Sequence, residues 1–226
     1  MHSIGTEKER KLHAMLKLYF ESDKSFHEQR IKGYIADIKR DNRIIEIQTR
    51  SFDKLKNKLN AFLSDDFDVT VVYPIAKQKW LIWVDPDTGE AQKKRKSPKT
   101  GTVYDCFKEL YKIREYLSFQ NLKLVLAFCD MEEYKLLCGW SRDRKKGSER
   151  IERYPVSDFE LITVSGDGYR MLVPEDLEDE FTSKDFQKAA KITLGCAQKA
   201  VNLLCKTGAI EKVGKTGRLN LYSRAM

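Results

Sequence analysis

The sequence lacks the apolar segments that membrane and secreted proteins need. No stretch approaches the roughly 18 consecutive apolar residues of a membrane-spanning helix. The first residues, MHSIGTEKERK, contain no apolar core of a secretory signal. We therefore expect a cytoplasmic protein without a membrane partner.

Closely spaced cysteines are also missing. The five cysteines, at positions 106, 129, 138, 196 and 205, form no CxxC pair and lie mostly among apolar neighbours. An odd number of widely spaced cysteines argues against a zinc site or a disulfide framework. Reduced thiols in a cytosolic core are the simplest interpretation.

What the chain has in quantity is positive charge and apolar side chains. Its 226 residues are 41% hydrophobic, enough for one α/β domain and a small second one. Forty-two Lys and Arg against 34 Asp and Glu give a net charge of +8. This excess favours a polyanionic partner, and nucleic acid is the leading candidate.

Residues 34–48, YIADIKRDNRIIEIQ, are typical of a β-hairpin with its turn at Asp41-Asn42. A two-residue loop would place Asp37 opposite Glu46, with Gln48 on the same face. Facing carboxylates destabilise a sheet by up to about 1 kcal/mol. A divalent cation would compensate them; the alternative is a solvent-facing hairpin whose acids pair with nearby basic residues.

Asp37 followed by Glu46-Ile47-Gln48 resembles the motif of the PD-(D/E)xK nuclease superfamily, in its ExQ variant. The order of elements from about residue 6 to residue 75 is also similar to that fold. Roughly the first 165 residues also resemble a group of uncharacterised bacterial proteins with this predicted nuclease core. The pieces that carry the resemblance are EKERKLHAMLKLYF, GYIADI, IIEIQTRSF, KLKNKL, VVYPIAKQKW and RKSPKTG.

The resemblance implies an α/β (α+β) fold, a restriction-endonuclease-like mixed sheet flanked by helices, over residues 1–165. It implies that Asp37, Glu46 and the carbonyl of Ile47 ligate Mg²⁺ or Mn²⁺. Glu9, in the first helix, would orient the metal-bound water or contribute to a second metal site; otherwise it is a helix-dipole partner. Gln48 stands in the place of the usual lysine.

A glutamine brings no positive charge to the site, so another cation would have to substitute for the lysine. A neighbouring cation such as Lys39 or Arg50 is the candidate. In the nuclease interpretation Arg50 also lies near the scissile phosphate. The most basic stretch, residues 92–102, either is a solvated loop or binds the phosphate backbone through Lys93, Lys94, Arg95, Lys96 and Lys99.

Hydrophobic periodicity predicts the other elements of this domain. We expect helices over residues 6–20, 53–63 and 103–117, strands over 26–31, 69–75, 80–84, 122–129, 134–140 and 159–164, and a basic turn over 142–146.

Small turn-forming residues at 165–168 mark a junction, so residues 166–226 form a second predicted domain. Thr182 caps a helix to about residue 191, and Thr193 opens another through Lys206. Two strands, 209–213 and 218–223, follow around a glycine-flanked basic turn. This order resembles a winged helix-turn-helix domain, in which Gln198, Lys199 and Asn202 would face the major groove and Lys215 and Arg218 the backbone.

The two segments predict a metal-dependent endonuclease that cleaves double-stranded DNA and is targeted by a winged helix. One alternative is a DNA-binding regulator or adaptor whose nuclease-like core is degenerate, because Gln48 replaces the lysine. RNA as the substrate, protein contacts of the winged helix and a homodimer also stay open at this stage.

Overall fold

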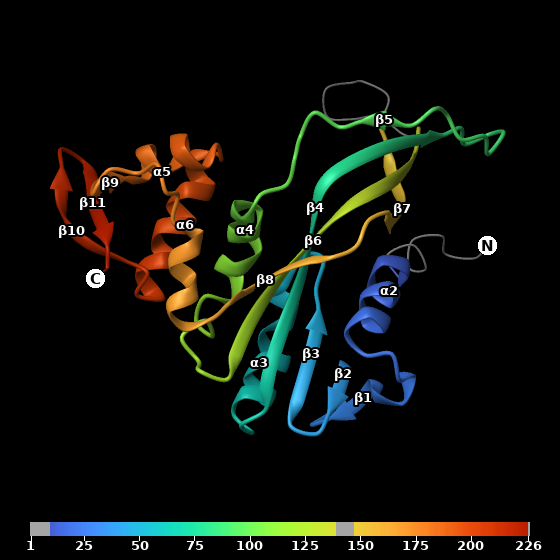
Figure 1. Cartoon of the computed structure of the whole chain (residues 1–226), viewed down its shortest axis with the longest axis horizontal. Coiled ribbons are helices and arrows are strands. Elements are labelled where there is room, and N and C mark those ends of the chain that lie inside the picture. Colours follow the sequence, from blue (N-terminus) through green and yellow to red (C-terminus); the bar gives the residue numbers. More distant parts are fainter. Residues whose placement is uncertain (1–9, 139–146, 226) are drawn as a thin grey trace. The chain divides into compact units, whose positions relative to one another are not determined.

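The computed structural model describes residues 10–138 and 147–225. It has an eight-stranded mixed sheet flanked by helices and a separate three-stranded sheet (Figure 1). The expected mixed α/β class is therefore confirmed. Glu9 and the basic turn expected at 142–146 lie outside the described residues.

The chain divides into two compact units. The first comprises Met1–Ser25, Pro74–Thr102 and Ala127–Leu161, and the second Phe26–Tyr73, Val103–Leu126 and Ile162–Met226. Two long strands, β4 (Asp68–Val84) and β6 (Leu122–Leu136), contribute residues to both. The predicted hairpin and the C-terminal segment therefore belong to the second unit.

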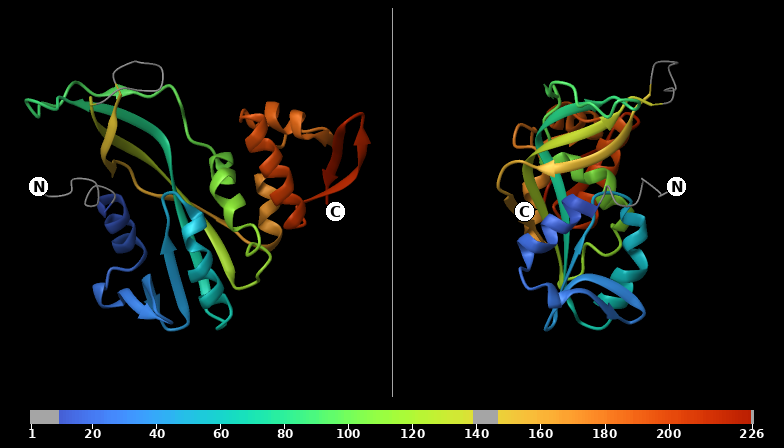
Figure 2. Two further views of the ribbon diagram at one scale, coloured as in Figure 1. Left: turned by 180° about the vertical axis from the view of Figure 1, so that it is seen from behind. Right: turned by 90° about the vertical axis from the view of Figure 1, so that its right-hand side faces the viewer.

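In the second unit, three short strands lead into β4. The strands β1 (His27–Ile31), β2 (Tyr34–Arg40) and β3 (Arg43–Ile47) are successive neighbours, and β3 pairs with β4 in parallel. Asp41, in the predicted turn, has a φ of 51°. A 3-10 turn η2 (Phe52–Leu55) precedes α3 (Lys56–Leu63), which lies along one face of the sheet beside β3 (Figures 1 and 2).

The long strands differ from the sequence prediction. We expected a break between residues 75 and 80, but β4 continues through it. The polar groups there are satisfied within the fold: Gln78 donates from its side-chain nitrogen to the carbonyls of Lys79 and Ser97, and from its backbone N–H to Asp130. Bonded polar groups can stay buried in a strand. Likewise β6 runs on to Leu136, past its predicted end at residue 129.

The first unit contains a helix that packs against one of its strands. In α2 (Arg10–Phe20), Leu12 and Leu16 are buried, while Lys11 binds Glu152 and Tyr154 on β7 (Glu149–Pro155). The sequence did not predict β7, which pairs antiparallel with β6. The short strands β5 (Arg95–Lys96) and β8 (Glu160–Val164) pair with β4 and β6.

The helix expected over 103–117 is broken into three short turns, η3 (Val103–Cys106), α4 (Phe107–Leu110) and η4 (Tyr111–Ile113). Phe107, Leu110 and Ile113 are buried. Phe107 and Leu110 are the ends of α4, and Ile113 ends η4. The buried face of the predicted helix is therefore kept although the helix is interrupted.

The C-terminal elements follow the predicted order. After η5 (Gly166–Leu172) and β9 (Glu180–Thr182) come α5 (Ser183–Ala190), α6 (Leu194–Lys206), β10 (Ile210–Thr216) and β11 (Leu219–Arg224). Thr182 and Asp185 form a capping box on α5, and the small sheet has the order β10-β11-β9. The hairpin turn is tighter than predicted, because Thr216 already pairs with Leu219.

Candidate active site

The hairpin carries its two acids where β2 and β3 stop pairing. The predicted register is confirmed for the pairs from Arg40 and Arg43 to Ile38 and Ile45, where the pairing ends. The sequence predicted that Asp37 and Glu46 pair directly in the ladder. Instead they are the first residues beyond its last pair. There Asp37 Oδ2 accepts the backbone N–H of Ile47 at 2.7 Å. A side-chain carboxylate thus satisfies a strand N–H that would otherwise need a backbone acceptor.

Glu46 is almost completely buried, with 1% of its surface exposed. The ammonium of Lys58, on α3, binds both of its carboxylate oxygens, at 3.1 and 2.8 Å. Burial, and then the nearby charge of Asp37, raise the pKa of Glu46 from 4.5 to about 7, although Lys58 acts in the opposite direction. Glu46 therefore takes on its negative charge only near neutral pH, and a further cation would then be stabilising.

Gln48 continues β3 and holds the loop that follows it. Its backbone N–H donates to Val72 at 2.9 Å. Its side-chain nitrogen donates to the carbonyls of Arg50 and Ser51, and Ser51 has a left-handed φ of 58°. The amide nitrogen thus positions the loop that presents the exposed Arg50, and the side-chain oxygen is the atom with which Gln48 can accept a hydrogen bond from water.

A second buried acid supports the same loop. Glu109 Oε2 accepts the backbone N–H of Phe52 at 3.0 Å. Lys112 binds Glu109 at 2.8 Å and Asp53 at 3.3 Å, and its hydrogen bond lowers the pKa of Asp53. The start of η2 is therefore anchored from a segment more than fifty residues away in sequence.

Lys58 is the residue of the candidate site that sequence reasoning missed. Lys39 and Arg50 were the expected substitutes for the absent lysine, whereas Lys58 belongs to a helix whose lysines looked like solvated surface. Its approach to Glu46 depends on how residues 49–55 turn between β3 and α3. The spacing of the residues gives no signal for that turn.

The predicted phosphate-binding run belongs to the first unit, whereas the acid pair and Arg50 belong to the second. Lys93, Lys94, Arg95, Lys96 and Lys99 are all exposed. Lys94 already has an acidic partner, Glu132, at 3.0 Å. The run is therefore accessible to a polyanion, but one of its charges is partly neutralised.

In the C-terminal segment, the five residues predicted to contact DNA are exposed: Gln198, Lys199, Asn202, Lys215 and Arg218. The opposite side of α6 is buried through Ala197, Val201 and Leu204. The ammonium of Lys199 lies 5.8 Å from the centre of the Tyr111 ring, in the same unit. Lys199 therefore also contacts the protein beside α6.

The donor set at the hairpin fits Mg²⁺ or Mn²⁺. Within the described ranges no group of three or more His, Cys, Asp and Glu side chains could hold a metal. Mg²⁺, however, is often bound through one or two carboxylates, with water and phosphate completing its coordination. Asp37 and Glu46 would supply such a pair, and the charge of Asp37 adds to burial, the larger cause, in raising the pKa of Glu46.

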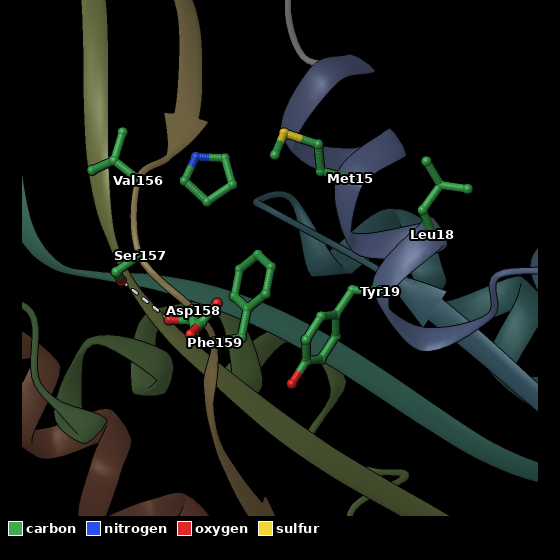
Figure 3. Close-up of a pocket in the computed structure, with 8 residues that line it drawn as sticks. Met15, Leu18, Tyr19, Val156, Ser157, Asp158 and Phe159 are labelled. Carbon is green, nitrogen blue, oxygen red and sulfur yellow. Dashed lines mark hydrogen bonds between the residues drawn. The ribbon is translucent and has the colours of Figure 1, made fainter.

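The first unit contains a pocket with a volume of about 810 Å³. Met15, Leu18 and Tyr19 on α2 line it opposite Val156–Phe159, and Tyr19 meets Phe159 edge to face at 4.9 Å (Figure 3). Asp158 is its one acidic lining residue. The pocket is mostly apolar and holds none of the predicted site residues.

No helix of the described part of the chain is long and apolar enough to cross a membrane. The family described as "Domain of unknown function (DUF8091)" matches the chain over residues 10–165. An "Uncharacterized protein" of Treponema pallidum (strain Nichols) is 28% identical over 230 residues, which cover 98% of this chain and 88% of the relative. No solved structure matches the chain.

Proposed function

The chain belongs to the DUF8091 family, and we propose that it is a metal-dependent endonuclease that hydrolyses phosphodiester bonds in double-stranded DNA. One observation supports this most: a buried Glu46 next to Asp37, at the point where two strands separate. Burial and the neighbouring charge of Asp37 raise the pKa of Glu46 even though Lys58 binds it, and a buried acid perturbed in this way favours a functional site.

In this proposal Asp37 and Glu46 hold Mg²⁺ or Mn²⁺, with the carbonyl of Ile47 as a further ligand. The metal would polarise the phosphoryl oxygen and lower the pKa of the attacking water. Lys58, bound to Glu46, supplies the positive charge that Gln48 lacks. Gln48 instead fixes the loop, so that Arg50 is presented to the phosphate backbone.

The C-terminal segment would direct the enzyme to DNA as a winged helix-turn-helix. Support comes from the order of its elements and from the exposed polar side chains of α6 and of the β10–β11 hairpin. The T. pallidum relative aligns over 98% of the chain. Both segments are therefore present together in that protein.

The direct test is cleavage of supercoiled plasmid by the wild type with Mg²⁺, Mn²⁺, Ca²⁺ or EDTA. We expect nicked or linear product with Mg²⁺ and Mn²⁺ and none with EDTA. Asp37→Asn, which keeps the shape of the side chain but removes its charge, should be inactive while keeping the wild-type circular dichroism spectrum. Equal cleavage by wild type and Asp37→Asn would contradict the proposal.

A second candidate is a non-catalytic DNA-binding adaptor, and the Lys58–Glu46 ion pair favours it. An ammonium that already neutralises Glu46 competes with a metal for the same carboxylate. In this interpretation the chain binds duplex DNA with a strong dependence on salt, but no metal supports cleavage.

A further inference from the structure

A strongly basic face lies on the strands of the first unit, around one buried acid. Glu133, on β6, has a side chain that is only 4% exposed. Three cations approach its carboxylate: Arg150 at 3.4 Å, Lys135 at 3.5 Å and Lys79 at 3.9 Å. One carboxylate cannot balance three cations, so this cluster keeps a net positive charge of two.

The strand register adds further basic residues to the same face. Arg153 on β7 pairs directly with Glu133 on β6, and directly opposed residues share a face. The register of β6 and β7 shifts between Tyr134 and Lys135. Such a bulge changes the direction of the following side chains, and it brings Arg150 to the side of Arg153. We call Lys79, Lys135, Arg150, Arg153 and Trp83 the Glu133 face.

On the opposite face of the same strands, the described ion pairs balance positive with negative charge. There Lys94 pairs with Glu132 at 3.0 Å, and Lys11 of α2 pairs with Glu152 at 3.1 Å. Glu132 and Glu133 are consecutive in β6, so their side chains point to opposite faces. The excess charge is therefore a property of one side of the sheet, where β4, β6 and β7 lie side by side (Figure 1).

An aromatic ring lies beside these cations. The ammonium of Lys135 lies 5.5 Å from the centre of the Trp83 ring on β4. Arg95, from the basic run, pairs with Leu81, two residues before Trp83, so alternation places it on the same face. The cations also remain accessible: 44% of the Arg150 side chain, 31% of Lys79 and 25% of Lys135 are exposed.

We propose that the Glu133 face binds single-stranded nucleic acid. Lys79, Lys135 and Arg150 would contact successive phosphates, and an unpaired base would stack on Trp83. A sheet face that combines cations with an aromatic ring suits a single strand, because its bases are free to stack. The inference rests on the proposed function in one respect, that the substrate is a nucleic acid. Binding at the Glu133 face needs neither the metal nor the acid pair.

The test is fluorescence anisotropy with a labelled oligothymidylate of about 20 nucleotides, in EDTA so that cleavage plays no part. Compared with the wild type, Lys135→Gln/Arg150→Gln should bind at least about 10-fold more weakly. A plot of the logarithm of the binding constant against the logarithm of the salt concentration should have a slope smaller in magnitude by about 1.4, which is about 0.7 for each lost phosphate contact. The control Lys11→Gln/Lys32→Gln removes the same charge from cations paired with Glu152 and Asp65, and it should bind like the wild type.

Trp83→Leu should weaken oligothymidylate binding by about 10-fold, through lost stacking, and leave the binding of a blunt duplex unchanged. Thermal melting checks that each variant is folded. The inference is overturned if the wild type does not bind the oligonucleotide, if the two double variants bind alike, or if Trp83→Leu binds like the wild type. Plasmid cleavage by the wild type in Mg²⁺ reports on the nuclease separately.

Discussion

Glu46→Gln should abolish metal-dependent DNA cleavage and yet leave the protein at least as stable as the wild type at pH 8. Removing a group that only supports a metal ligand typically costs 10- to 100-fold in affinity or activity. Losing a ligand should cost more than about 100-fold. Plasmid cleavage measures the activity, and urea unfolding measures the stability.

The expected stability follows from the pKa of Glu46, which burial raises from 4.5 in an ordinary setting to about 7 in the fold. Below about pH 4.5 Glu46 is protonated in both the folded and the unfolded protein. Between pH 4.5 and about pH 7 it keeps its proton only in the folded protein. The unfolding free energy of the wild type should therefore fall by roughly 2 to 3 kcal/mol between pH 5 and pH 8 through this group. Glu46→Gln has no such titration, so it should lack this part of the fall.

Glu133→Gln is the matched control, because Glu133 is also a buried, ion-paired acid. This variant leaves three cations without their shared partner, so we expect lower stability, but cleavage that still depends on Mg²⁺. Opposite signs for the two variants would identify Glu46 as a functional acid whose charge is kept at a cost in stability. Loss of stability at pH 8 in Glu46→Gln would mean that Glu46 mainly serves the ion pair with Lys58.

Lys58→Met should reduce cleavage at pH 7.5 by about 100-fold, the cost typical of losing one stabilising group at a charged transition state. Without the ammonium, the pKa of Glu46 should rise further, because Lys58 lowers it in the wild type. The pH profile of cleavage should then move toward higher pH. Cleavage rates between pH 6 and pH 9 measure both effects.

Two variants on the same helix serve as controls for Lys58→Met. Lys58→Arg keeps the positive charge beside Glu46 and should restore most of the activity. Lys56→Met changes the first residue of α3 and should leave the pH profile unchanged. A profile that does not move in Lys58→Met would show that Lys58 does not control the ionisation of Glu46.

The sequence predicted the local features of the site well. The alternation of apolar residues in 34–48 and the turn-forming Asp41 define the hairpin, and its register is confirmed from Ile38 to Lys39 and Arg40. Thr182, Asp185 and Thr193 likewise mark the starts of α5 and α6. Each of these signals acts within a few residues, so a single sequence contains it.

Contacts between distant segments could not be predicted. The ion pair of Lys58 depends on the path of residues 49–55, and the support of Phe52 by Glu109 depends on tertiary packing. The separation of β2 and β3 at Asp37 is also invisible in the residue pattern, which alternates through residue 48 as if the ladder continued. The single long β4 arises because Asp130 and Ser97 satisfy Gln78 from outside the strand.

The measurement that tests the central claim most directly is Mn²⁺ binding by calorimetry, because it needs no knowledge of the DNA substrate. At pH 8 the wild type should bind Mn²⁺, and Asp37→Asn and Glu46→Gln should not. The affinity should weaken as the pH falls through about 7, where Glu46 takes up a proton. Absence of binding by the wild type, or equal binding by all three proteins, would contradict a metal site at Asp37 and Glu46.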